Sequence, residues 1–91
     1  MFNDLKDTLG LMCSSSYKDR FKAEYYQLNI RYNKLKDMCE KWDNGKLDFT
    51  PTCNRSIYNI QLRAMEDYLV ILEERAKIEG IELKEVNYEE K

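Results

Sequence analysis

Apolar side chains recur along the chain in two long series that have the spacing of an α-helix. The first series advances by four and three residues in turn, which places its members on one face of a helix. Ser16 followed by Asp19 predicts the start of this helix, and Asn44 with Gly45 predicts its end. The expected helix covers residues 17–43, about 40 Å at 1.5 Å per residue. Its apolar face consists of Phe21, Tyr25, Leu28, Tyr32, Leu35, Cys39 and Trp42.

The second series has the same spacing and predicts a helix over residues 55–79 that Gly80 ends. The two series pair in antiparallel order, from Phe21 with Ala76 to Cys39 with Tyr58, and the residue numbers of each pair add to 97. A constant sum is the condition for an antiparallel helical hairpin, in which the two apolar faces interdigitate. The second face consists of Tyr58, Leu62, Met65, Leu69, Leu72 and Ala76.

The rest of the chain adds shorter segments to this hairpin. Apolar residues at helical spacing predict a short amphipathic helix over residues 1–13, interrupted by Gly10. The connector contains Leu47, Phe49 and Pro51, and we expect it to fold against Trp42. Residues 84–91 form an acidic tail. We therefore expect residues 1–91 to form a single all-α helical domain.

The second helix carries a further apolar stripe beside the face that pairs in the hairpin. Together the two stripes form an arc that is wider than one partner helix can cover. The N-terminal helix could fold over the stripe and give a three-helix monomer, but it supplies only about three turns against about six. This difference favours a homo-oligomer. Its expected interface consists of Ile57, Ile60, Ala64, Tyr68 and Ile71, and the stripe continues to Ile78.

The composition excludes most kinds of catalytic site. The chain has no His, and therefore no imidazole base and no Ser–His or Cys–His nucleophile pair. Cys13, Cys39 and Cys53 lack the spacing of a metal site, so we expect no metal and no cofactor. The abundant acids and lysines form no convergent set distinct from ordinary helix surface, so we expect no enzymatic activity. A net charge of −2 argues against general nucleic-acid binding. No apolar stretch is long enough to span a membrane, and we expect a cytoplasmic protein with reduced thiols.

Charge is distributed unevenly along the chain. Residues 17–36 contain six basic and two acidic residues, whereas residues 66–91 contain four basic and nine acidic residues. Pairing between the helices or between protomers explains this distribution without a ligand. The alternative is a strip that binds an anionic nucleotide, in which cations contact phosphate and aromatic rings stack on a base. The candidate ligand-binding residues of the strip are Tyr17, Lys18, Arg20, Lys22 and Tyr26.

A second candidate anion site precedes the second long helix. Residues 50–56 deliver hydroxyl groups and the arginine Arg55 to a helix N-terminus, where unpaired N–H groups favour negative charge. Ordinary helix capping is the alternative function of this segment. Arg55 and Ser56 lie at the far end of the hairpin from the basic strip. The two sets can therefore form one pocket only if a second protomer packs antiparallel.

Several stretches of the chain carry a family resemblance: residues 17–25, Arg31-Tyr32, Lys34-Leu35, residues 49–53, residues 61–65, Tyr68-Leu69 and residues 79–81. They resemble a group of short helical proteins carried by phages and prophages of low-GC Gram-positive bacteria. The likeness covers about residues 17–83 and carries no catalytic signature. The order of long helix, connector and second helix is also similar to that of anti-CBASS sponge proteins, which bind cyclic nucleotide immune signals between protomers.

These resemblances imply a phage immune-evasion protein that sequesters a cyclic oligonucleotide signal without cleaving it. One alternative is a protein–protein inhibitor of a host defence complex, similar to an anti-CRISPR, that docks its acidic C-terminal half on a basic groove. Another is a structural or regulatory phage protein without a small ligand.

Overall fold

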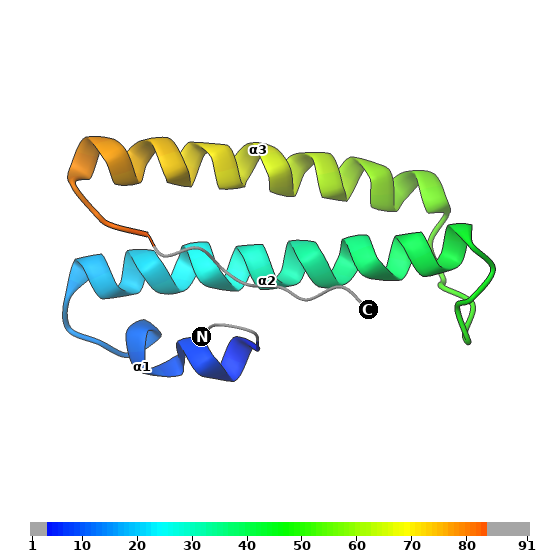
Figure 1. Ribbon diagram of the computed structural model, residues 1–91, viewed down its shortest axis with the longest axis horizontal. Helices are drawn as coiled ribbons and strands as arrows, with labels where there is room; N and C mark the ends of the chain where they lie inside the picture. Colours follow the sequence, from blue (N-terminus) through cyan, green and yellow to red (C-terminus); the bar gives the residue numbers. More distant parts are fainter. Residues whose placement is uncertain (1–3, 84–91) are drawn as a thin grey trace.

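The computed structural model describes residues 4–83, and all regular structure in this range is helical. A 3-10 helix, η1 (Leu5–Thr8), runs directly into the short helix α1 (Leu9–Met12). The long helices α2 (Tyr17–Asp43) and α3 (Arg55–Glu79) follow, with the bounds that the apolar spacing predicts. Figure 1 shows α2 and α3 lying side by side as an antiparallel hairpin. The predicted all-α hairpin is therefore confirmed for the described residues.

The hairpin closes along the predicted faces and within one residue of the predicted register. The Tyr25 hydroxyl donates to Glu73 Oε2 at 2.8 Å, and the Tyr32 hydroxyl donates to Glu66. The residue numbers of both pairs add to 98, one more than the sum expected for the apolar pairs. Burial of the paired faces supplies the main stabilisation of the hairpin. The hydrophobic core consists of Phe21, Tyr25, Tyr26, Leu28, Leu69, Leu72, Ala76 and Ile81.

Local chemistry ends each long helix where the sequence suggests. Ser16 has the extended backbone of an N-cap, but it is the Ser14 hydroxyl that donates to Asp19, at 2.9 Å. Gly80 has a φ of 71°, a left-handed conformation that L-amino acids with a side chain rarely adopt. The N–H of Ile81 then donates to the Ala76 carbonyl at 2.8 Å. This turn directs Ile81 back into the core, where it is buried.

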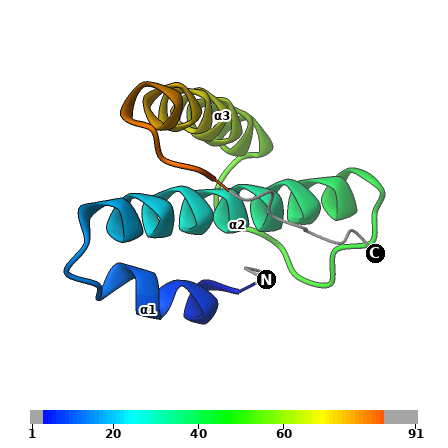
Figure 2. The same cartoon turned by 60° about the vertical axis from the view of Figure 1, so that its left-hand side comes forward.

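The N-terminal segment, defined as η1 and α1, packs on α2 and makes no such packing contact with α3. Figure 2 shows α2 between α3 on one side and this segment on the other. The Gln27 amide donates to the buried Thr8 hydroxyl at 2.9 Å, which links the segment to α2. Ala23 and Ile30 are buried although they lie on the side of α2 that turns away from α3. The short helix predicted over residues 1–13 forms as η1 followed by α1, with Gly10 inside α1, and residues 1–3 of the prediction lie outside the described residues.

This arrangement rules out the possibility that the N-terminal helix covers the second stripe of α3. Every large apolar member of the stripe is exposed, from Tyr68 at 41% to Ile78 at 83%. The small member of the stripe, Ala64, is exposed as well. The reason is that α2 has a second apolar side of its own, and the N-terminal segment is only long enough to cover that one.

The connector is held at its two ends rather than by its apolar residues. Arg55 forms a fork on Asp43, with Nε–Oδ1 and Nη2–Oδ2 distances of 3.0 Å. The rings of Trp42 and Tyr58 meet edge to face at 6.0 Å. Leu47 is half-buried, whereas Phe49 is 56% exposed. The ring that packs on Trp42 is thus Tyr58 of α3, and Phe49 of the connector stays exposed.

The tyrosine–glutamate bonds across the hairpin make its stability sensitive to high pH. Burial and donation to Glu73 raise the pKa of Tyr25 to about 12, and donation to Glu66 raises the pKa of Tyr32 to about 12. A raised pKa means that the folded state favours the protonated phenol. This stabilisation is complete below the usual tyrosine pKa of about 10 and is lost as the pH rises through 12.

We therefore expect the advantage in melting temperature of the native chain over the Tyr25→Phe/Tyr32→Phe variant to shrink between pH 9 and pH 12. Circular dichroism melts of both proteins at each pH measure this difference. A constant gap across the range would show that the two hydroxyl groups are not protonation-linked to folding.

Candidate functional site

The predicted basic strip does not form one surface. Lys18 and Lys22 are four residues apart and share a side of α2, whereas Arg20 is two residues from each and points about 200° away at ~100° per residue. Arg20 also donates through Nη1 to the Ser14 carbonyl at 3.0 Å, which ties it to the turn before α2. The structure therefore brings Lys18 and Lys22 together and separates Arg20 from them.

The two aromatic members of the strip are occupied within the fold. Tyr26 is only 1% exposed and lies in the core, so the expectation that it stacks on a ligand base is corrected. Tyr17 is half-exposed, but its hydroxyl donates to Glu79 at 2.8 Å and accepts from Arg75 at 3.0 Å. Donation to Glu79 also raises the pKa of Tyr17. Tyr17 thus joins α2 to the end of α3.

The second predicted anion site is also largely engaged. Arg55 donates to Asp43 and, through Nη1, to the Asn59 side chain at 2.7 Å. This pairing lowers the pKa of Asp43, so its carboxylate stays ionised and attached to Arg55. Ser56 is exposed at the first turn of α3. Within one chain, the structure does not bring Arg55 and Ser56 to the residues of the basic strip at the other end of the hairpin.

A hollow that sequence analysis did not predict lies where η1, α2 and α3 meet. It has a volume of about 380 Å³, within the size range of small-molecule sites. Its apolar lining comes from all three elements, and Arg31, Lys34 and the Gln61 amide supply its polar groups. Among residues 4–83, no acidic residue lines it. We call it the three-helix hollow; its apolar lining consists of Leu5, Ile30, Leu35, Met38 and Met65.

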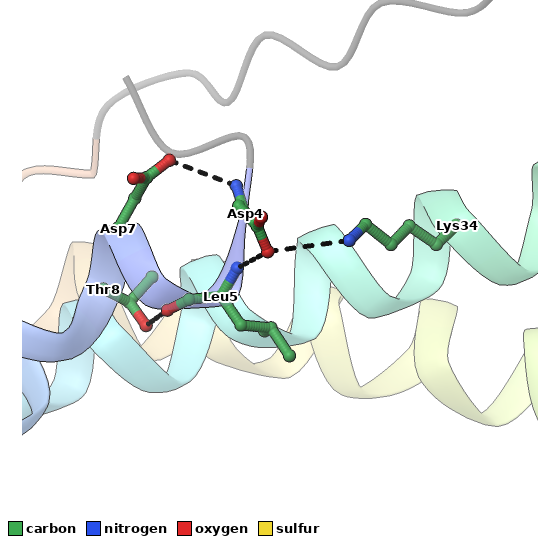
Figure 3. A network of polar contacts seen from close by, with 5 residues as sticks. All are labelled: Asp4, Leu5, Asp7, Thr8 and Lys34. Carbon is green, nitrogen blue, oxygen red and sulfur yellow. Dashed lines mark hydrogen bonds and ion pairs between the residues drawn. The ribbon is translucent and has the colours of Figure 1, made fainter.

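Lys34 is positioned at this hollow by the start of η1. The Asp4 side chain accepts the Leu5 N–H at 2.7 Å, while the Asp4 N–H donates to Asp7 at 3.2 Å. The Asp4 carboxylate fixed in this way lies 3.7 Å from Lys34 Nζ (Figure 3). Both groups are about half-exposed, so the ion pair is weak and an anionic ligand can displace it.

A second hollow adjoins the first at the connector. It has a volume of about 450 Å³ and shares Lys34 and Met38 with the three-helix hollow. Lys41 and Lys46 add positive charge, but Asp37, Glu40 and Asp48 balance it. The exposed ring of Phe49 lies on its wall. The two hollows together present cationic side chains, an apolar lining and the exposed ring of Phe49, which are the kinds of group that bind a nucleotide.

Comparison with known protein families matches residues 15–78 to the Sequestin family. The chain belongs to the Sequestin family. The match covers α2, the connector and nearly all of α3, and it begins after α1. The family name fits a protein that sequesters a ligand. No curated protein and no solved structure matches the chain.

Among residues 4–83 of this Sequestin protein, no helix is long and apolar enough to cross a membrane. In the same range, no three His, Cys, Asp or Glu side chains gather in a way that could hold a metal ion. Cys13 and Cys53 are exposed thiols. Cys39 is a buried thiol, and its burial raises its pKa.

Proposed function

We propose that this Sequestin protein is a phage immune-evasion protein that sequesters a cyclic oligonucleotide signal of the host in the three-helix hollow. The observation that supports this location is the combination of an apolar lining with Arg31, Lys34 and Gln61, and the described residues that line it include no acidic one. Membership of a family named for sequestration supports the mode of action.

Each lining group has a specific part in this binding. The Arg31 guanidinium can contact two phosphate oxygens in a planar fork, and Lys34 adds a point charge. The Gln61 amide can both donate to and accept from the edge of a base. The base itself lies on the methionine and leucine side chains of the lining. The adjoining hollow, with Phe49, receives a second nucleotide unit.

Sequestration requires no bond to be cleaved, and the lining suits that role. The three-helix hollow presents a guanidinium, an ammonium, an amide and apolar groups, none of which is a general base at neutral pH. A ligand held there is therefore released unchanged when the protein unfolds.

The acidic half of the chain gives less support to the alternative of a protein inhibitor that mimics nucleic acid. Glu66, Glu73 and Glu79 accept hydrogen bonds from tyrosines of α2, and Glu74 pairs with Lys77 at 3.3 Å. These carboxylates are used within the hairpin. The acidic tail over residues 84–91 lies outside the described residues.

Titration calorimetry with cyclic di-AMP, cyclic di-GMP and cyclic tri-AMP tests the proposal. We expect one of them to bind, and we expect Arg31→Ala/Lys34→Ala to weaken that binding at least about 100-fold, because two charge-assisted contacts of about 1.5–3 kcal/mol each are lost. The matched control is Lys18→Ala/Lys22→Ala, which removes the same charge from the predicted strip and should bind as the native chain does.

The outcomes separate the alternatives. A loss of binding in the control and not in the hollow variant would move the site to the basic strip. Heat release of the bound ligand followed by mass spectrometry should recover it intact, and a cleaved product would refute sequestration. If none of the three nucleotides binds, inhibition of a host defence protein becomes the better hypothesis.

A further inference from the structure

The exposed face of α3 has the repeat of a helix that packs against another helix. Ile57, Ala64, Ile71 and Ile78 follow one another every seven residues, with Ile60 three residues after the first. A repeat of seven keeps a narrow seam facing one partner helix. These isoleucines are 49–83% exposed, so no element of the described part of one chain packs on the seam. We call this seam the α3 outer face.

Nothing within residues 4–83 covers the α3 outer face, because the N-terminal segment packs on α2. A continuous exposed apolar seam of this length on one helix is typical of a protein interface. The occupant must supply an equally long apolar seam of complementary shape and charge.

A second copy of the same helix meets these conditions when it runs antiparallel. If the two helices cross between Asp67 and Tyr68, Ala64 lies opposite the partner's Ile71 and Ile57 lies opposite the partner's Ile78. The small Ala64 thereby makes room for the partner's Ile71, as close packing requires. A parallel pair would place Ala64 opposite the partner's Ala64 and leave a gap at the centre of the seam.

Charge along one edge of the seam favours the same orientation. Arg63, Asp67 and Glu74 lie on this edge, since they are four and seven residues apart. Like edges face each other in an antiparallel pair, so Arg63 lies opposite the partner's Glu74, twice by symmetry. Asp67 lies near its own copy at the axis, but the two Arg63–Glu74 pairs outnumber this one like-charge contact. In a parallel pair in register the two different edges face each other, so Arg63 would lie near the partner's Tyr68 instead of a carboxylate.

We propose that this protein forms a two-fold symmetric homodimer through the α3 outer faces, packed antiparallel with Ala64 opposite the partner's Ile71. The other edge of the seam then places Gln61 opposite the partner's Arg75. Because Gln61 lines the three-helix hollow, the second copy stands at the rim of that hollow. This last consequence rests on the proposed function, whereas the dimer itself does not.

Sedimentation analysis of the full chain at micromolar concentration tests the dimer without any ligand. We expect a species of twice the 11.0 kDa chain mass. Arg63→Glu places like charges opposite each other and should weaken the dimer at least about tenfold, with helicity retained by circular dichroism. Arg63→Glu/Glu74→Arg should restore it. Lys18→Glu, the same charge change on α2, should not affect the dimer.

A monomeric native chain, or a dimer that Arg63→Glu leaves intact, would overturn the proposal. Failure of the double variant to recover the dimer would overturn the antiparallel register. Ligand binding by a monomeric native chain would overturn the dimer alone and leave the proposed function in place.

Disulfide formation tests the orientation independently, in a chain whose exposed Cys13 and Cys53 are replaced by Ser and whose buried Cys39 is kept. Tyr68→Cys lies beside the symmetry axis and should form a covalent dimer on oxidation. Ile57→Cys should not, because its copies lie about 30 Å apart along the seam at 1.5 Å per residue. Cross-linking of both variants to equal extent would show a parallel pair and overturn the proposal.

Discussion

Leu72→Ala should lower the free energy of unfolding by about 2–5 kcal/mol, the range for a buried leucine truncated to alanine. Leu72 has no exposed surface and lies in the core between Leu69 and Ala76. The loss combines the transfer free energy of the removed methyl groups with the cavity that they leave. Urea unfolding monitored by circular dichroism measures this difference.

Val70→Ala is the matched control for this prediction. Val70 lies two residues away on the same helix and is 56% exposed, so its truncation should change the unfolding free energy by no more than about 0.5 kcal/mol. If the two variants unfold at the same urea concentration, the face of α3 that packs on α2 has been assigned to the wrong residues.

Ile30→Ala should also lower the free energy of unfolding by about 2–5 kcal/mol, but through the loss of a different contact. Ile30 is fully buried on the side of α2 that faces away from α3, where it lines the three-helix hollow with Leu5. Its truncation removes the support of the N-terminal segment. We therefore expect both a lower unfolding free energy and faster cleavage by trypsin at Lys6, an exposed residue of η1.

Ile30→Val provides a graded control, since the loss of one methylene group should cost only about 0.5–1.5 kcal/mol. Cleavage at Lys6 should accelerate in the same order, from the native chain through Ile30→Val to Ile30→Ala. Destabilisation without faster cleavage would mean that Ile30 supports the hairpin rather than the N-terminal segment.

The hairpin could be predicted from the sequence because the apolar spacing and the helix-end residues that specify it are local and periodic. Each long helix carries an unbroken seam, and residues such as Gly80 mark where the seams end. The constant sum of the paired residue numbers predicts the antiparallel register, and the Tyr25–Glu73 bond lies within one residue of it.

The place of the N-terminal segment could not be obtained in the same way. Ala23, Tyr26 and Ile30 form a second apolar series on α2, and this signal was present in the sequence. Tyr26 is predicted to stack on a ligand base, and the spacing alone gives the series no partner. A pattern on one helix shows that a face is buried, but it does not show which of several short apolar segments covers it.

The three-helix hollow was beyond sequence analysis for a related reason. Leu5, Arg31 and Gln61 are far apart in the chain and come together only when three elements have packed. Arg31 and Lys34 were visible as part of a basic region, but their neighbours near Tyr17 have the denser clustering of charge and aromatic rings. The clustering of charged and aromatic residues near Tyr17 therefore predicts a binding strip there. In the helix, however, the side chains of these residues point in different directions.

The central position of α2 has a consequence for how the protein opens. Amide hydrogens exchange with deuterium when local structure opens, and each region has its own opening free energy. Release of the N-terminal segment leaves α2 covered by α3, so this step exposes the amides of α1 and not those of α2. The slowest exchange should therefore fall between Phe21 and Ile30, where α2 buries side chains against both neighbours. Exchange in that stretch then reports the opening of the whole molecule.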